Sequence, residues 1–85
     1  MQKHEWREEK DGEQMVWRAE IHGDRWKVMS RPKKEEDWTR YDPIPLEIWK
    51  KLREVLWNKY QRNRCPHKFI VAIDKIIEKE GEEDN

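Results

Sequence analysis

Hydrophobic and polar residues alternate along the first third of the chain, from residue 3 to residue 31. Alternation with a period of two is typical of a β-strand that buries one face. Two turn signals, Asp11-Gly12 and Gly23-Asp24, divide this stretch into three segments of similar length. The pattern therefore predicts three antiparallel strands joined by two-residue loops.

Each turn sets a register, so the two turns can be tested against each other. A loop at Gly23-Asp24 separates the residues of the second and third strands into an apolar face and a polar face. A loop at Asp11-Gly12 pairs the first strand with the second so that its residues fall on the same apolar and polar faces. The expected pairs are Ile21–Trp26, Ala19–Val28, Trp17–Ser30, Glu20–Lys27, Arg18–Met29, Val16–Arg31, Glu5–Arg18 and Trp6–Trp17. Because two independent turns agree on the buried face, we expect both registers to be correct.

Residues 38–41 predict a short fourth strand after a charged turn, and its register stays open. One offset buries Tyr41 and leaves Trp38 beside Arg31 on the polar face. The other offset buries Trp38 together with Arg40. A shift of one residue exchanges the two faces of a strand, so a segment this short satisfies either choice.

The second half of the chain has helical periodicity. Residues 45–62 begin with Pro45, which suits the first turn of a helix, and their apolar positions span about 200° of its circumference. A one-sided surface helix needs about half that width, so we expect this helix to contact both the sheet and a second helix. The second helix is predicted over 66–79 with a stop at Gly81. Residues 68–73 are also compatible with a strand.

These elements predict an α+β fold, an antiparallel meander of three or four strands packed on a long central helix, with a second C-terminal helix. We expect a single domain over residues 1–80 and a frayed acidic tail over 81–85. Hydrophobic residues make up 34% of the 85 residues and charged residues 45%, so six tryptophans must supply much of the core. We expect Trp6, Trp17, Trp26 and Trp49 in the core, and leave Trp38 and Trp57 open.

The formal net charge is zero, so no global field attracts the chain to nucleic acid or membrane. The charge is nevertheless uneven, because residues 45–68 carry +5 and residues 69–85 carry −4. One cysteine permits no internal disulfide and fits a reducing compartment. No apolar run approaches 18 residues. We therefore expect a cytoplasmic protein with no membrane partner.

Little in the sequence favours catalysis. Cys65 precedes a predicted helix, but no residue near it is an obvious base and no glycine-rich loop supplies oxyanion donors. The carboxylates lie mostly in consecutive runs, which are usually solvated. Paired Cys or His spacings of a structural zinc site are missing from the sequence. We expect no enzyme, no metal and no cofactor, with Cys65 catalysis as a distant third hypothesis.

The strongest candidate site is a group of basic and aromatic residues on and beside the predicted polar face. Glu5, Glu20 and Glu36 are close enough in the predicted sheet to neutralise part of it. Trp and Arg are frequent at the centres of protein interfaces, which favours a protein partner or a homo-oligomer. The alternative is nucleic-acid binding by the basic β-hairpin. The candidate binding residues are Arg18, Arg25, Lys27, Arg31, Lys33, Lys34, Trp38 and Arg40.

Overall fold

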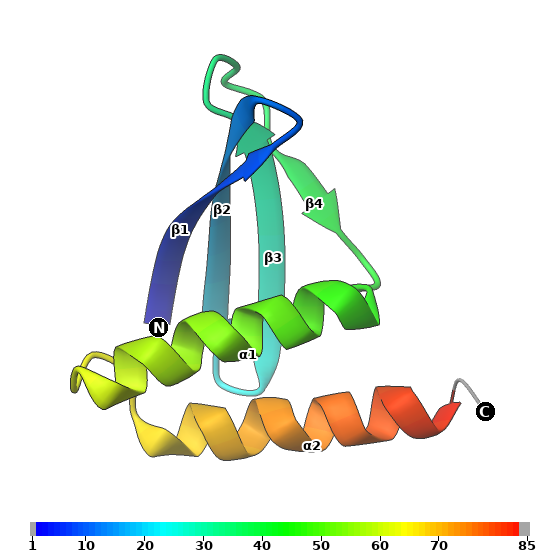
Figure 1. Ribbon diagram of the computed structural model, residues 1–85. Helices are drawn as coiled ribbons and strands as arrows, with labels where there is room; N and C mark the ends of the chain where they lie inside the picture. The colour runs from blue at the N-terminus through cyan, green and yellow to red at the C-terminus, as the bar shows by residue number, and fades with distance from the viewer. Residues whose placement is uncertain (1, 84–85) are drawn as a thin grey trace. The chain divides into compact units, whose positions relative to one another are not determined.

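A computed structural model describes residues 2–83 and contains four strands followed by two helices (Figure 1). The predicted α+β class, with an antiparallel meander followed by two helices, is confirmed. The strands are β1 (Gln2–Lys10), β2 (Glu13–His22), β3 (Arg25–Pro32) and β4 (Thr39–Tyr41), and the helices are α1 (Leu46–Gln61) and α2 (His67–Glu83).

The chain divides into two compact units, and the boundary lies between Pro43 and Ile44. The first unit holds the sheet, and the second holds α1 and α2. We describe each unit separately. The expectations that they form a single domain, and that the first helix covers the sheet, stay predictions.

The sheet has the order β1-β2-β3-β4, and all its strands are antiparallel. Every predicted pair of the first three strands is confirmed, from Trp6 opposite Trp17 to Ile21 opposite Trp26. Asp11 and Gly12 both have positive φ angles, 53° and 79°. Two such residues in succession form the turn that best matches the twist of a two-residue hairpin. The loop chemistry therefore explains why the register could be derived from the sequence.

The register of β4 resolves the alternative that the sequence left open. Tyr41 lies opposite Val28, so it shares the apolar face, and Trp38 lies on the side of Arg31. The Tyr41 hydroxyl forms a 2.8 Å hydrogen bond with the Ser30 hydroxyl. The first of the two predicted offsets is the one observed.

Three rings form a continuous row across the apolar face, which we call the aromatic row: Trp6, Trp17 and Tyr41. The ring centroids of Trp6 and Trp17 are 5.9 Å apart, and those of Trp17 and Tyr41 are 5.4 Å apart, with nearly parallel planes in both pairs. Ser30 lies opposite Trp17 on β3. Its small side chain leaves the space through which Tyr41 reaches Trp17 from the next strand.

Burial on the apolar face is greatest near β2 and β3. Ala19, Ile21, Val28 and Ser30 are essentially inaccessible to solvent. Of the four tryptophans expected in the core, Trp49 is buried, and Trp6, Trp17 and Trp26 are half-buried. Trp38 and Trp57, which the sequence left open, are half-buried as well. None of the six indoles is therefore fully exposed.

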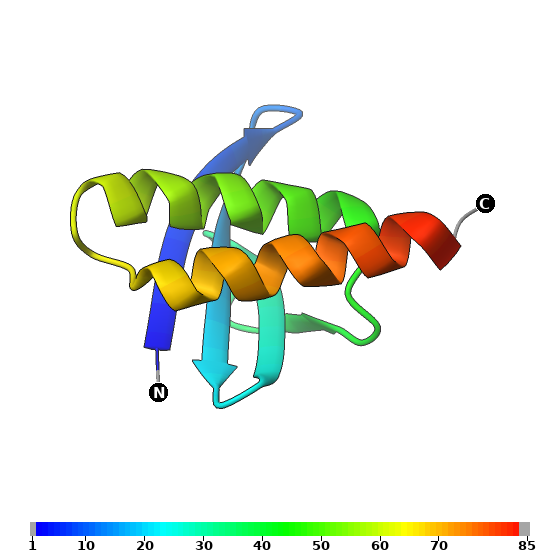
Figure 2. The same ribbon diagram turned by 90° about the horizontal axis from the view of Figure 1, so that it is seen from below.

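In the second unit, α1 and α2 form an antiparallel hairpin, and the two helices lie side by side (Figure 2). Leu52 and Leu56 of α1 and Ile70 and Ile73 of α2 are buried. The hairpin is also joined on its surface by Arg53, whose Nε donates to Asp74 Oδ1 over 2.9 Å. Residues 68–73, which the sequence left compatible with a strand, lie within α2 and are helical.

Helix α2 continues through Gly81 to Glu83, so the predicted stop at Gly81 is wrong. Gly81 does not have a positive φ angle, and nothing lies within 4 Å of the position where a Cβ would stand. A glycine stops a helix when it adopts the left-handed conformation, which is not the case here. Residues 81–83 of the predicted frayed tail are helical, so the prediction is wrong for them, and its last two residues lie outside the described range.

Candidate interaction surface on the charged face of the sheet

The face of the sheet opposite the aromatic row carries most of the candidate residues, and we call it the charged face. Strand alternation and the observed registers assign residues to it. Seven cations and three carboxylates lie there, which gives this face a net charge of +4. The cations are Lys3, Arg7, Arg18, Arg25, Lys27, Arg31 and Arg40, and the carboxylates are Glu5, Glu9 and Glu20.

Trp38 lies beside two arginines of this face. The guanidinium carbon of Arg18 is 4.8 Å from the centroid of the Trp38 ring, and that of Arg31 is 5.1 Å away. Both distances are within the range of a cation–π interaction. The ring is therefore already in contact with cations and is not an open platform on which a nucleic-acid base can stack.

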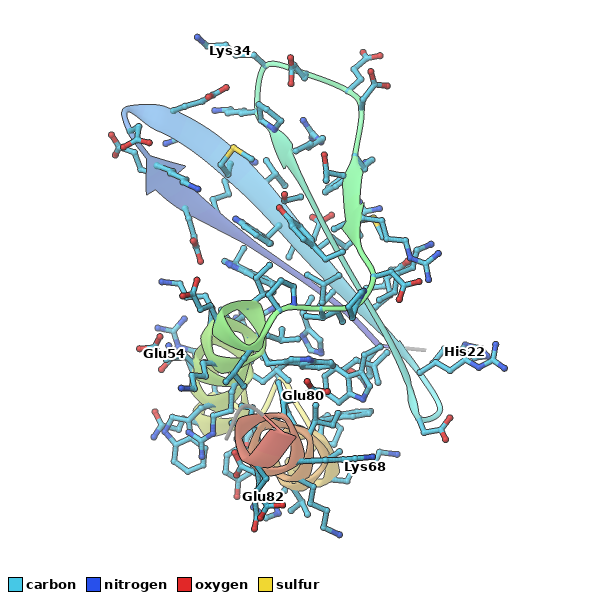
Figure 3. All side chains as sticks on the ribbon, turned by 90° about the vertical axis from the view of Figure 1, so that its right-hand side faces the viewer. His22, Lys34, Glu54, Lys68, Glu80 and Glu82 are labelled. Carbon is cyan, nitrogen blue, oxygen red and sulfur yellow. The ribbon has the colours of Figure 1, made fainter. Side chains whose placement is uncertain are left out.

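Arg31 also holds the loop that follows β3. Its Nη1 donates to the carbonyl of Glu35 over 2.9 Å, with longer bonds to the carbonyls of Pro32 and Lys33. The backbone of Lys33 donates in turn to Gln14 on β2 over 2.9 Å. These bonds keep the loop closed on the sheet, with the Lys34 side chain pointing outward from its tip (Figure 3).

Two of the candidate cations, Arg18 and Lys27, are partly neutralised by the acidic residues that the sequence placed beside them. Arg18 donates to Glu5 Oε1 from Nε over 2.8 Å and also from Nη2. Lys27 lies 3.9 Å from Glu20. Glu36, the third predicted partner, pairs with none of the residues that the structure describes. Neutralisation is therefore confined to the middle of the charged face.

Of the remaining candidate cations, Arg31 is half-buried, whereas the other four are exposed, and within residues 2–83 none of these four has a carboxylate partner. Arg25 ends the face at the β2–β3 turn, near the labelled His22 in Figure 3, and Arg40 lies opposite Met29 on β4. Lys33 and Lys34 lie in the loop at the other end of the sheet. The structure thus presents four available positive charges around a central region of ion pairs.

Sequence reasoning missed a small apolar cluster on this charged face. Val16 and Met29 are only 7% and 8% exposed, although their neighbours across the strands are Arg31 and Arg18. We attribute their burial to the aliphatic stems of these arginines together with Trp38, because long cationic side chains commonly cover apolar surface. The signal for this cluster in the sequence was that each of the two hydrophobic residues falls opposite an arginine in the predicted register. Trp38 contacts the same two arginines that lie opposite Val16 and Met29.

Cys65 is the residue proposed for the distant catalytic hypothesis, and it is 4% exposed. Burial raises the pKa of its thiol, while the charge of Lys59 acts in the opposite direction. A reactive cysteine requires a lowered pKa and access to substrate.

Within residues 2–83, no cluster of three or more His, Cys, Asp or Glu residues is arranged to hold a metal ion.

The cationic segment 45–68 forms the α1 side of the helical hairpin and the turn after it. Trp57 and Tyr60 lie 5.5 Å apart between ring centroids, and Tyr60 lies 5.1 Å from His67. Arg53 lies over Trp57 at 5.1 Å while it pairs with Asp74. Trp57 and Tyr60 therefore contact each other along α1, and Tyr60 also contacts His67 at the start of α2.

Comparison with protein families, with curated proteins and with solved structures finds no match to this chain. In the part of the chain that the structure describes, neither helix has the length and apolar character needed to cross a membrane.

Proposed function

We propose that the protein is a non-catalytic interaction module whose charged face binds an acidic surface of a protein partner. The observation that supports this proposal is the set of four exposed cations, Arg25, Lys33, Lys34 and Arg40, that have no carboxylate partner among the described residues. Arginine binds carboxylates through two parallel hydrogen bonds, so an acidic protein surface complements this set.

The ordering of the charged face supports the same proposal. Arg31 holds the loop through three carbonyls, and Arg18 and Arg31 both contact Trp38. A surface that is already ordered loses little conformational entropy when a partner binds. The chain has one cysteine and so permits no internal disulfide, which fits the cytoplasm, the reducing compartment that we propose.

Nucleic acid is the second candidate, and the net charge of +4 favours it. The position of Trp38 argues against it, because single-strand binding usually depends on open aromatic faces. We therefore rank an acidic protein surface above nucleic acid.

The test is a heteronuclear NMR titration of the labelled protein at low salt. One probe is a short oligoglutamate peptide, and the other is a pool of single-stranded oligonucleotides. We expect the peptide to shift the amides of residues 25–40, and we expect added salt to reverse the shifts. Strong oligonucleotide shifts that include Trp38 would favour the second candidate.

The variant that tests the site combines Arg25→Glu with Arg40→Glu, and its expected effect is a loss of at least tenfold in peptide affinity, since about 1.4 kcal/mol suffices for that change. The matched control combines Lys75→Glu with Lys79→Glu on α2, which changes the net charge equally at exposed positions. If both variants weaken binding to the same extent, net charge and not the charged face governs binding, and the proposal is wrong.

A further inference from the structure

Strand β1 is the first strand of the sheet, and on its outer side the described chain places no other strand. It is nine residues long, whereas the opposite edge strand, β4, has three residues. A long edge strand offers a row of backbone N–H and C=O groups to a further strand. The chemistry of this edge indicates which strand would fit it.

The geometry of the β1–β2 hairpin shows which residues direct their backbone groups outward. The loop has two residues, so Lys10 and Glu13, which flank it, form a hydrogen-bonded pair. Hydrogen-bonded and non-hydrogen-bonded pairs then alternate along the strand, which makes Trp6–Trp17 a hydrogen-bonded pair. The outward N–H and C=O groups therefore belong to the residues between these pairs, which are Lys3, Glu5, Arg7 and Glu9.

The same four residues are all exposed, and they alternate in charge along the charged face, from Lys3 to Glu9. Within residues 2–83, Lys3, Arg7 and Glu9 form no ion pair, and Glu5 contacts Arg18 through one carboxylate oxygen, Oε1. The edge thus combines available backbone groups with a regular alternation of positive and negative side chains.

This alternation is self-complementary in an antiparallel pairing about a two-fold axis at Trp6. Lys3 then lies opposite Glu9 of a second copy, and Glu5 lies opposite Arg7 of that copy. Symmetry repeats both pairs, so four ion pairs form on one face. Opposite charges directly across antiparallel strands stabilise the pairing, and like charges destabilise it.

The neighbouring registers lack this complementarity. A two-fold axis at Glu5 places two Glu5 side chains opposite each other and Lys3 opposite Arg7. An axis at Arg7 places two Arg7 side chains together and Glu5 opposite Glu9. Axes at His4 and at Glu8 also place opposite charges together on this face, but each forms two ion pairs over a shorter overlap. The axis at Trp6 forms four, so the sequence of β1 favours that register.

The aromatic row provides an independent argument for the same axis. Trp6 is half-buried and ends the row at the open edge, 5.9 Å from Trp17. Across a two-fold axis at Trp6, the two Trp6 residues form a non-hydrogen-bonded pair, in which side chains approach most closely. The row would then continue from one copy into the next, with an aromatic pair at the junction.

We propose that two copies of the protein pair through β1 in antiparallel orientation about Trp6, forming one continuous sheet with four strands from each copy. The partner at this edge is a second copy of the chain. The proposal uses the edge of the sheet and does not depend on what binds the charged face.

The test measures self-association by sedimentation equilibrium across the concentration range used for NMR. Lys3→Glu alone and Glu9→Lys alone each place like charges opposite each other at two symmetric positions. We expect each single variant to weaken the dimer at least about tenfold. In an equimolar mixture of the two variants, every altered residue faces an opposite charge, so we expect a heterodimer of wild-type strength.

Recovery in the mixture cannot arise from general destabilisation, because each variant carries its own substitution in both experiments. Amide hydrogen exchange supplies a second measurement. The outward amides of Lys3, Glu5, Arg7 and Glu9 should gain protection as the concentration rises, while the amide of Trp6 is protected at every concentration.

Three results would overturn the proposal. The first is a wild-type protein that stays monomeric throughout the range. The second is a dimer that both single variants leave unchanged. The third is a mixture that associates no better than the single variants.

Discussion

Ser30 shows how a single small residue determines the arrangement of three rings. It is 1% exposed, and its hydroxyl is hydrogen-bonded to Tyr41. A larger side chain at this position on β3 would stand between Trp17 and Tyr41, which are in contact across the strand. The aromatic row on the apolar face therefore depends on a residue that the sequence pattern alone marks only as a polar interruption.

Cys65 leads to a prediction about pH. Burial raises the pKa of its thiol above the ordinary value that it has in the unfolded chain, and Lys59 opposes this rise. The unfolded chain therefore loses the proton at a lower pH than the folded protein. The protonated thiol of Cys65 therefore contributes to the stability of the folded protein. This contribution is fully present below the ordinary pKa of cysteine and is lost as the pH rises through the raised pKa.

We expect the free energy of unfolding in urea to fall more steeply between neutral and alkaline pH in the wild type than in Cys65→Ser. Thiol-specific reagents should label folded Cys65 more slowly than Cys65 in denaturant. Faster labelling in the folded state would show an activated thiolate and would revive the catalytic hypothesis for this residue.

At the level of elements, α2 illustrates the difference between a glycine that ends a helix and one that lies within it. Gly81 is helical with open space around its missing Cβ, whereas Gly23 in the β2–β3 turn has a φ angle of 64°. Alanine is favoured over glycine within a helix and disfavoured at positive φ. The same substitution should thus have opposite effects at the two positions.

We predict that Gly81→Ala stabilises α2 by up to about 1 kcal/mol and that Gly23→Ala destabilises the sheet by about 1–2 kcal/mol. Urea denaturation followed by circular dichroism measures both changes. A loss of stability in Gly81→Ala would indicate that the helix ends at Gly81 in solution.

The loop between β3 and β4 is the other element that depends on distant contacts. Arg31 donates to the carbonyls of Pro32, Lys33 and Glu35, which are close to it in the sequence, and the Lys33 amide donates to Gln14 on another strand. At the end of the loop, Trp38 lies beside Arg18 and Arg31, and Tyr41 lies on the apolar face. The contacts of Lys33 with Gln14 and of Trp38 with Arg18 join segments far apart in the sequence, so local pattern alone could not select the offset of β4.

At the scale of the whole molecule, the zero net charge conceals two distinct surfaces in the sheet unit. The four exposed candidate cations that have no carboxylate partner among the described residues lie on β3, on β4 and in the loop between them, and the edge of β1 carries alternating charges. The first surface suits an acidic partner, and the second suits an identical copy. Interactions at sites without shared groups are expected to be nearly additive.

This separation predicts that the two interactions can be removed one at a time. Glu9→Lys should weaken the dimer and leave oligoglutamate binding unchanged or slightly tighter, because it adds a positive charge. Arg25→Glu combined with Arg40→Glu should weaken peptide binding at least about tenfold and leave the dimer intact. Sedimentation and NMR titration of the same variants measure both properties, and joint loss in either variant would show that the two surfaces are one.

The sequence by itself determined the elements and the registers of the first three strands. Two-residue turns impose a register, and alternation then assigns each side chain to one face, so Trp6 opposite Trp17 followed from local chemistry. The helical period of residues 45–62 was equally clear, whereas residues 68–73 were also compatible with a strand. Six of the eight candidate residues were assigned to their places in the sheet or the loop after β3 on the same basis, with Trp38 and Arg40 left conditional on the β4 offset.

Only the tertiary structure decided the features that depend on contacts between distant segments. The offset of β4, the burial of Val16 and Met29, and the contact of Trp38 with two arginines belong to this group. The end of α2 was also decided by the structure, because glycine is compatible with a helix interior and with a stop. In the other cases the local pattern allowed more than one arrangement, and contacts with residues elsewhere in the chain selected one of them.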